Sequence, residues 1–302
     1  MMRPCLLARP CLLVLAISLA SATAGADTDA RDYEAPVFLP NGSTAVNTYV
    51  RHVTSSDKLD LVENQALFRV SHIRKLGQLV IVPFDAYLPI ADVTVFAPTG
   101  TPGLTTAVNR SGLGDLTYLP SIEYFIPQDR VNHTYFGLTT YLTLPTGAYK
   151  ATNPINIGAN RWAFMPQLAV GQRAFDMLTA ELVASVALYG GNDQVEIPMA
   201  GLQTLHQDPT YTVELHVAAD LSPTFYTSLD YFFRADGRGS IDLPGAPDTQ
   251  VIAADHVHAL RYSFGIRPAP TSLLLLQLQE DLAVTHGASL GRFFGMRYSH
   301  VL

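Results

Sequence analysis

The chain has 302 residues, of which 48% are hydrophobic and only 15% charged, and its formal net charge is −7 at pH 7. Soluble domains carry roughly 25% charged residues, so the composition favours a membrane protein, and the acidic balance with no basic patch argues against a nucleic-acid partner. After the N-terminal segment, no apolar run reaches the roughly 18–20 residues that a membrane-spanning helix needs. Apolar residues that are frequent but dispersed are typical of a transmembrane β-barrel, in which every second residue faces lipid. A soluble β-sandwich is the alternative at this point.

The N-terminus has the three parts of a secretory signal peptide. Arg3 and Arg9 form the positive region, residues 12–20 form the apolar region, and Ala24-Gly25-Ala26 is a cleavage site of small residues before Asp27. Both cysteines precede that site. The mature chain would therefore have no disulfide and no thiolate chemistry.

The rest of the chain alternates apolar and polar residues with period two, which is the pattern of strands with one apolar face. In residues 211–221 the odd positions are mostly apolar, and residues 225–234 repeat the alternation after a turn at Ser222-Pro223. Pro83 and Pro89 weaken the strand that contains them. Strands are expected near residues 44–54, 64–74, 78–90, 113–126, 134–145, 160–172, 175–189, 210–221, 224–235, 254–267, 272–285 and 288–302. We therefore predict an all-β fold, a transmembrane antiparallel β-barrel of about 12 strands.

The connections between these strands alternate between long and short along the chain. Long connections are expected near residues 55–63, 91–112, 146–159, 190–209 and 236–253, and tight ones at residues 75–78, 173–174, 222–223 and 268–271. Bacterial barrels have long extracellular loops and short periplasmic turns, whereas a soluble sandwich has no reason to separate them. The short connection at His286-Gly287 departs from this pattern. An even number of strands places both termini in the periplasm.

These patterns predict a signal peptide at residues 1–26 and a bacterial outer-membrane barrel at residues 27–302, in which residues 27–40 form a loosely ordered periplasmic lead. The expected partners are outer-membrane lipid, the barrel-assembly machinery and a small hydrophobic solute.

The polar residues of the alternating strands face the lumen if the apolar face contacts lipid. An Arg or Lys facing lipid at mid-depth would cost roughly 2–4 kcal/mol. The predicted lumen-lining residues are Arg69, Asp85, Asp115, Glu123, Arg161, Glu181, Glu214, His216, Asp230, Arg234, Arg261 and Arg297. They could form a polar conduit or binding site, or ion pairs that fill a narrow barrel. Around the Ser222-Pro223 turn we expect His216 beside Glu214 and Asp230, because cross-strand neighbours lie about 4.5–5.5 Å apart.

No residue pattern indicates an enzyme, a cofactor or a metal site. His256 and His258 share one strand face, as two zinc ligands can, but no further ligand is placed near them. A G-x-S-x-G nucleophile motif is absent. Residues 112–115 lack the later glycine of a dinucleotide-binding loop. We therefore predict a protein without catalytic residues, cofactor or metal.

One region is more specific than the alternation. It contains Gly112-Leu-Gly114-Asp115, then Pro145-Thr-Gly147-Ala-Tyr149, and then Asn156-Ile-Gly158-Ala-Asn160-Arg-Trp162. This region resembles the outer-membrane family named for the meta-cleavage pathway of phenol degradation, with its G-x-G-D and P-x-G-x-Y…N-x-G-x-N-x-W motifs. The resemblance covers most of residues 40–302. It implies an outer-membrane barrel associated with uptake of aromatic or other hydrophobic compounds, and it carries over no catalytic residue.

The residue types of this motif indicate that it shapes the backbone rather than binds a ligand. Gly147 and Gly158 are expected to adopt backbone angles that other residues resist. Trp162 and Phe164 share an outward face at a strand start, where an interfacial aromatic belt is expected.

The function predicted from the sequence is passive uptake of small hydrophobic or aromatic compounds. A barrel of about 12 strands lies between the filled eight-stranded form and the open sixteen-stranded porins, so a small lumen is feasible. The alternative is a structural or ligand-binding outer-membrane barrel without transport activity.

Overall fold

The computed structural model describes residue 29 and residues 32–55, 60–98, 105–129, 131–197, 200–243, 245–285 and 291–302. The predicted signal peptide at residues 1–26, with Cys5 and Cys11, lies outside the described residues. Among the described residues, no helix is long and apolar enough to cross a membrane.

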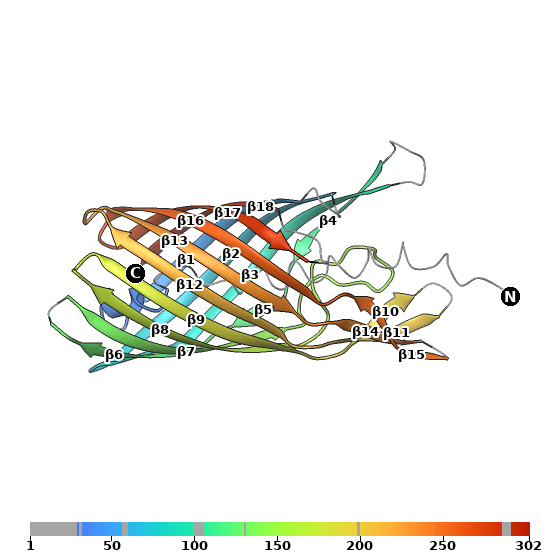
Figure 1. The fold of residues 1–302 in the computed structure, drawn as a ribbon, viewed down its shortest axis with the longest axis horizontal. Helices are drawn as coiled ribbons and strands as arrows, with labels where there is room; N and C mark the ends of the chain where they lie inside the picture. Colours follow the sequence, from blue (N-terminus) through green and yellow to red (C-terminus); the bar gives the residue numbers. More distant parts are fainter. Residues whose placement is uncertain are drawn as a thin grey trace.

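Twelve antiparallel wall strands close into a barrel, as the sequence predicts (Figure 1). Each wall strand pairs with its neighbours in the chain, and β1 closes the ring by pairing with β18 as well as with β2. Eleven wall strands are single elements: β1 (Thr44–Ser55), β2 (Asp60–Leu76), β3 (Leu79–Pro98), β7 (His133–Leu144), β8 (Ala163–Ala174), β9 (Leu178–Tyr189), β12 (Thr210–Asp220), β13 (Phe225–Asp236), β16 (Asp255–Ala269), β17 (Ser272–Val284) and β18 (Arg292–Val301).

The twelfth wall strand consists of three pieces, β4 (Thr105–Leu113), β5 (Leu116–Tyr118) and β6 (Ser121–Pro127), which pair in turn with β3. The first break lies at Gly114, where an added Cβ would lie 2.5 Å from Cγ of Pro89. Proline has no N–H to donate to a neighbouring strand, and the break opposite Pro89 accommodates it. For this reason β3 continues to Pro98, beyond the predicted end near residue 90.

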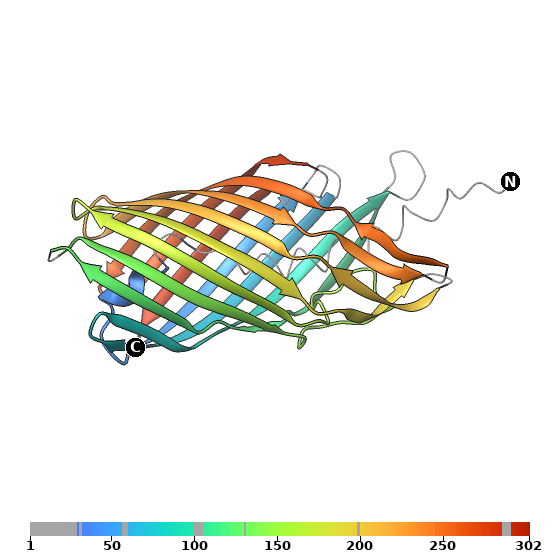
Figure 2. The same cartoon turned by 60° about the horizontal axis from the view of Figure 1, so that its bottom comes forward.

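Most connections at one end of the barrel are longer than the turns at the other (Figure 2). The long connections expected near residues 55–63 and 91–112 are wrong, because the strands extend further: β1 ends at Ser55 and β2 begins at Asp60, while β3 ends at Pro98 and β4 begins at Thr105. Two of the predicted loops contain hairpins that the sequence did not predict. These are β10 (Asn192–Ile197) with β11 (Gly201–Gln207), and β14 (Gly239–Leu243) with β15 (Ala246–Ile252). They form one sheet in the order β10-β11-β14-β15, which extends beyond the barrel end. Because β18 begins at Arg292 rather than near residue 288, the final connection is long, and the exception expected at His286-Gly287 disappears.

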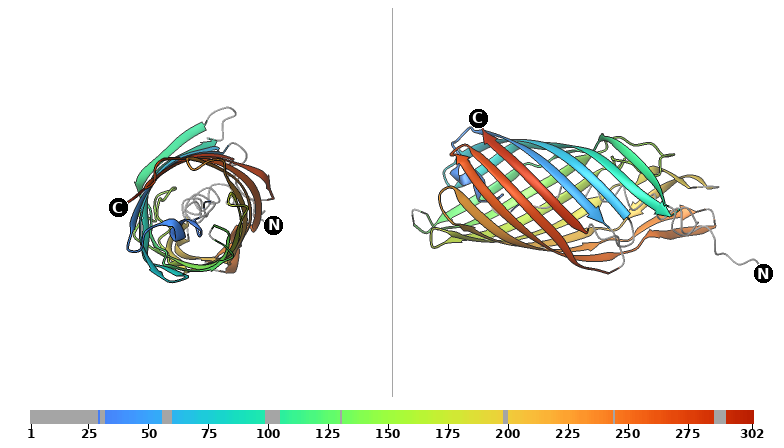
Figure 3. Two further views of the ribbon diagram at one scale, coloured as in Figure 1. Left: turned by 90° about the vertical axis from the view of Figure 1, so that its left-hand side faces the viewer. Right: turned by 90° about the horizontal axis from the view of Figure 1, so that it is seen from above.

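The sequence predicts a loosely ordered lead at residues 27–40, and this prediction is wrong for the residues that the structure describes. The segment before β1, with the short helix α2 (Ala35–Phe38), lies inside the ring of strands (Figure 3). Asp29, Tyr33 and Glu34 are at most 3% exposed. We call Asp29 and residues 32–39 the plug. The sequence prediction failed because the partners of the plug are wall residues far away in the chain.

The outer face of the barrel is apolar. Large hydrophobic side chains remain exposed on it along most wall strands, among them Val50, Phe68, Ile122, Phe136, Leu168, Leu182, Leu215, Leu229, Leu278 and Phe294. Trp162 and Phe164 also point outward, as expected. An apolar outer face around a polar interior is the arrangement that a lipid bilayer requires of a barrel.

Candidate channel interior

The plug is fixed to one side of the wall through Asp29. Its carboxylate accepts hydrogen bonds from Nη1 of Arg297 and Nε2 of Gln277, both at 2.6 Å, and lies 3.6 Å from Nη1 of Arg261. Burial opposes the charged form of this carboxyl, but Arg297 and Arg261 outweigh burial and lower the pKa of Asp29 to about 2. Asp29 is therefore a charged anchor on β16, β17 and β18.

Asp32 strengthens this anchor. It accepts a hydrogen bond from Arg297 at 2.9 Å and lies 3.5 Å from Nη1 of Arg69 on β2. Arg69 in turn forms an ion pair with Asp85 at 2.7 Å. The network of acids and arginines thus continues from the plug into the wall.

Glu34 holds the plug to the opposite side of the wall. Its carboxylate lies 3.4 Å from Nη1 of Arg173 on β8 and 3.4 Å from Nε2 of His133 on β7, and it accepts a hydrogen bond from Thr179 on β9 at 3.1 Å. The plug therefore bridges the lumen from β16–β18 to β7–β9.

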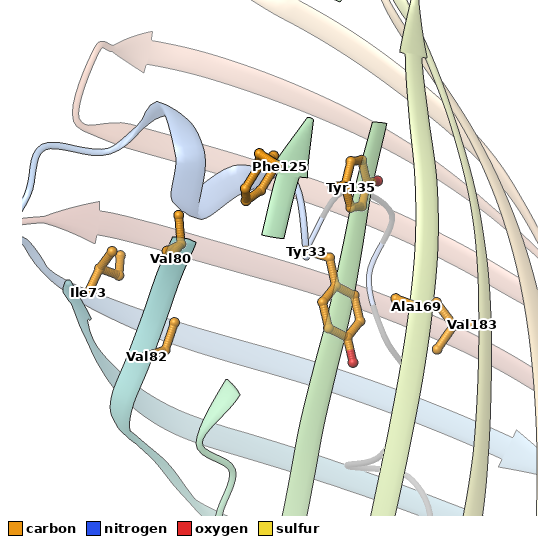
Figure 4. Packing of buried hydrophobic residues seen from close by; sticks show 8 residues of the cluster. All are labelled: Tyr33, Ile73, Val80, Val82, Phe125, Tyr135, Ala169 and Val183. Carbon is orange, nitrogen blue, oxygen red and sulfur yellow. The ribbon is translucent and has the colours of Figure 1, made fainter. Parts of the chain in front are cut away.

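Tyr33 fills the space between the two anchors. It packs in an apolar cluster with Ile73, Val80, Val82, Phe125, Tyr135, Ala169 and Val183 (Figure 4). Its ring lies directly over Gly137, where any Cβ would collide with it. Its hydroxyl donates to Oε1 of Gln167 at 2.8 Å.

A cluster of mostly apolar side chains lies beyond the plug on one side of the barrel interior, along β1, β2, β3, β7 and β8. We call this set the tyrosine layer, and its members are Tyr49, Leu67, Tyr87, Leu119, Tyr141 and Met165. Tyr141 donates to the same Gln167 oxygen as Tyr33, at 3.1 Å. The plug and the tyrosine layer are thus joined at one acceptor.

Two cavities lie on the two sides of the tyrosine layer. A vestibule of about 740 Å³ surrounds the plug at the end with short turns. An outer chamber of about 50 Å³ lies toward the long loops. Tyr141 lines both cavities, so this side chain separates them.

Ten of the twelve predicted lumen residues are at most 8% exposed, and the side chains of Arg69 and Arg234 are 22% and 20% exposed. The expected group around His216 is present: its Nδ1 lies 3.0 Å from Asp230, which faces it across β12 and β13, and its Nε2 lies 3.1 Å from Glu214. Arg261 lies 3.5 Å from the same Asp230. Much of the interior is therefore occupied by ion pairs.

Other predicted residues form their hydrogen bonds outside this group, although Glu181 lies directly across from His216 on β9. Glu181 accepts a hydrogen bond from Tyr135 at 2.7 Å, and Glu123 accepts one from Ser121 at 2.9 Å. Arg234 pairs with Asp236 at 3.0 Å. The sequence also failed to single out the buried residues Glu63 and Arg173. Both lie in segments that were predicted to connect strands, where no inward or outward parity was assigned.

The motif region has a structural role centred on Asp115. Its two carboxylate oxygens accept hydrogen bonds from the N–H groups of Gly147 and Ala159, each at 2.7 Å. Neither Gly147 nor Gly158 has a positive φ, so the expected need for unusual backbone angles is wrong. Both are required because a Cβ on Gly147 would lie 2.7 Å from Cα of Gly158.

The loop of residues 145–162 is consequently folded into the outer mouth of the barrel. Ile155 and Ile157 pack there with Leu61, Val93 and Val95. The loop carries Arg161, which is 4% exposed and whose guanidinium lies 4.5 Å from the ring of Tyr189. Burial lowers the pKa of Arg161 to about 10, still well above neutral pH.

The His256 and His258 pair faces outward beside aromatic residues. Both rings contact Phe233, and Nδ1 of His258 lies 2.6 Å from the hydroxyl of Tyr231. Within the described residues, no group of three or more His, Cys, Asp or Glu side chains is placed to hold a metal ion.

A family model described as "Putative MetA-pathway of phenol degradation" matches residues 41–284. The chain belongs to this family. The match covers most of the barrel and includes the whole region around Asp115. No curated protein matches the sequence.

Among solved structures, an outer membrane channel from Pseudomonas putida F1 is 25% identical and has a TM-score of 0.79, with 91% of this chain and 100% of the channel covered. A mutant of the monoaromatic hydrocarbon channel TodX is 9% identical with a TM-score of 0.45, covering 87% and 90% of the two chains. The β-domain of the Bordetella autotransporter BrkA is 12% identical with a TM-score of 0.47, covering 87% and 100%. The last two similarities are too weak to bear on function.

Proposed function

We propose that this protein is a bacterial outer-membrane channel for the passive uptake of small hydrophobic or aromatic compounds. The observation that carries the proposal is the tyrosine layer, an apolar patch on the inner wall of a barrel whose lumen holds many ion pairs. A water-filled pathway for ions has no use for such a layer, whereas aromatic solutes pack favourably on Tyr and Met side chains. The similarity to an outer membrane channel over 91% of this chain supports it.

Uptake through this interior requires the plug and the tyrosine layer to move. Tyr33 and Tyr141 share Gln167 and lie between the vestibule and the outer chamber. A solute that displaces Tyr141 would replace one apolar contact by another and leave Gln167 its hydrogen bond to Tyr33. The expected channel is thus closed at rest and admits small solutes one at a time.

The experiment compares uptake of radiolabelled toluene by cells that lack this protein and by cells that produce the wild type or a variant. Tyr141→Asp places a charge in the tyrosine layer and should reduce uptake at least about tenfold, because a carboxylate there raises the cost of an apolar solute. Tyr211→Asp is the matched control, since Tyr211 is exposed at the start of β12, at the edge of the outer face, where a charge costs little. Both variants must first appear as folded barrels in the membrane fraction. Equal uptake with and without the wild-type protein would refute the proposal and favour a structural or ligand-binding barrel without transport activity.

A further inference from the structure

The outer chamber has a positively charged lining. Among the described residues that line it, two are arginines and none is acidic: Tyr87, Tyr141, Thr143, Ala159, Arg161, Ala163, Met165, Ser185, Ala187, Tyr189, Thr210, Thr212 and Arg234. Arg234 has a carboxylate partner in Asp236, at 3.0 Å. Arg161 has no such partner among the described residues.

Arg161 is built into the chamber wall rather than left on a surface. One end of its guanidinium donates through Nη2 to Oε1 of Gln207, and its flat face lies against Tyr189. Its other end, Nη1, is buried and has no hydrogen-bond partner among the residues that the structure describes. The carboxylate of Asp115 acts on Arg161 at longer range, but its oxygens are already bound to Gly147 and Ala159. A buried cation with an unused donor is costly unless an anion pairs with it.

The size and polarity of the chamber indicate which kind of anion fits in it. One water needs roughly 10–15 Å³ of such a volume, so about 50 Å³ holds a few waters or one carboxylate group. A guanidinium donates two parallel hydrogen bonds to a carboxylate. Hydroxyl groups of Thr143, Ser185 and Thr212 line the same space and supply further donors.

The side of the chamber toward the lumen is aromatic. Tyr87, Tyr141 and Met165 line the chamber and also belong to the tyrosine layer. A ring attached to the carboxylate would therefore rest in the tyrosine layer while the carboxylate meets Arg161.

We propose that the outer chamber is a binding site for small aromatic carboxylates, with Arg161 as the residue that pairs with the carboxylate. The site selects acids among the aromatic compounds that the proposed function admits, and so it rests on that function. Arg161 would hold the solute at the extracellular side of the tyrosine layer before it passes toward the vestibule.

The test measures equilibrium binding by titration calorimetry of the detergent-solubilised full-length protein with benzoate, acetate and benzyl alcohol. We expect saturable benzoate binding, weaker acetate binding because the ring contacts are missing, and weaker benzyl alcohol binding because the charge is missing. Arg161→Gln should weaken benzoate binding at least about tenfold, as loss of a charge-assisted hydrogen bond does, and should leave benzyl alcohol unchanged. Arg161→Lys, which keeps the charge but loses the two-fold geometry, should lie between them. Arg292→Gln is the control, because Arg292 is exposed at the start of β18.

Each result of these titrations either supports or overturns the proposed carboxylate site. Benzoate binding that is equal in the wild type and Arg161→Gln, or no preference for benzoate over benzyl alcohol, overturns the assignment and leaves the chamber filled by water only. If Arg161→Gln does not fold, Arg161→Lys takes its place, and benzoate binding that is equal in Arg161→Lys and the wild type overturns the assignment. Binding in detergent does not depend on transport, so a failure of toluene uptake would count against the proposed function without removing this site.

Discussion

Replacement of Asp29 by asparagine is expected to release the plug. The lowering of the Asp29 pKa from 3.8 to about 2 corresponds to about 2 kcal/mol of preference for the docked, charged carboxylate. Asp29→Asn removes this contribution, so the population with the plug undocked should rise about 30-fold. Single-channel recording in planar bilayers measures this as a rise in the fraction of time spent open. Asp193→Asn is the control, because Asp193 is exposed on β10, in the small sheet at the barrel end away from the plug.

The same anchor predicts the effect of acid. The pKa of Asp29 is lower in the docked state, so its contribution to docking is complete above about pH 4 and is lost as the pH falls toward 2. The charged groups that face it are Arg297, Arg261 and Arg51, which keep their charge throughout this range. The wild type should therefore open more often at pH 3 than at pH 6, and Asp29→Asn should show a smaller change. The double variant Asp29→Asn with Arg297→Gln should open less than the two single effects combined, because both remove the same pair. An open fraction that is the same in Asp29→Asn and Asp193→Asn would refute the reasoning.

Three further predictions concern the wall and the motif region. Gly171→Val should destabilise the barrel by about 1–3 kcal/mol in urea unfolding, because the ring of Tyr135 lies over Gly171 and overpacking displaces it; an unchanged midpoint would show that Tyr135 can move freely. Asp115→Asn should expose the loop of residues 145–162 to protease on intact cells, since the carboxylate holds two backbone N–H groups, whereas the exposed Asp193→Asn should not; equal cleavage would contradict the structural role of Asp115. Leu215→Arg should reduce the folded, heat-modifiable band, as an arginine facing lipid at mid-depth costs about 2–4 kcal/mol; normal folding would show that Leu215 does not face lipid.

The wall of the barrel could be predicted from the sequence because its signal is local. Alternation in a strand such as residues 211–221 predicts which side faces lipid. The same parity predicts that Glu214, His216 and Asp230 lie on the inner face, and all three are buried in the structure. Their contacts follow from the register of one hairpin, which the short connection of residues 221–224 fixes.

The plug could not be predicted in this way, because its contacts are distant in the chain. Asp29 and Arg297 are 268 positions apart, and no local periodicity links them. Three acids between residues 29 and 34, next to a barrel rich in inward arginines, were the available signal. The hairpins β10–β11 and β14–β15 were missed for another reason: they are short, and register shifts interrupt their pairing, so their alternation is weak.

We infer that the channel is closed at rest and opens when its plug moves. The most direct test is to record the ion current through single barrels that lack residues 27–39. The account predicts rare, brief openings for the wild type and long-lived openings of small conductance for the shortened chain, because the tyrosine layer still narrows the lumen once the plug is gone. A shortened chain that is folded in the bilayer and passes no more current than the wild type would contradict it.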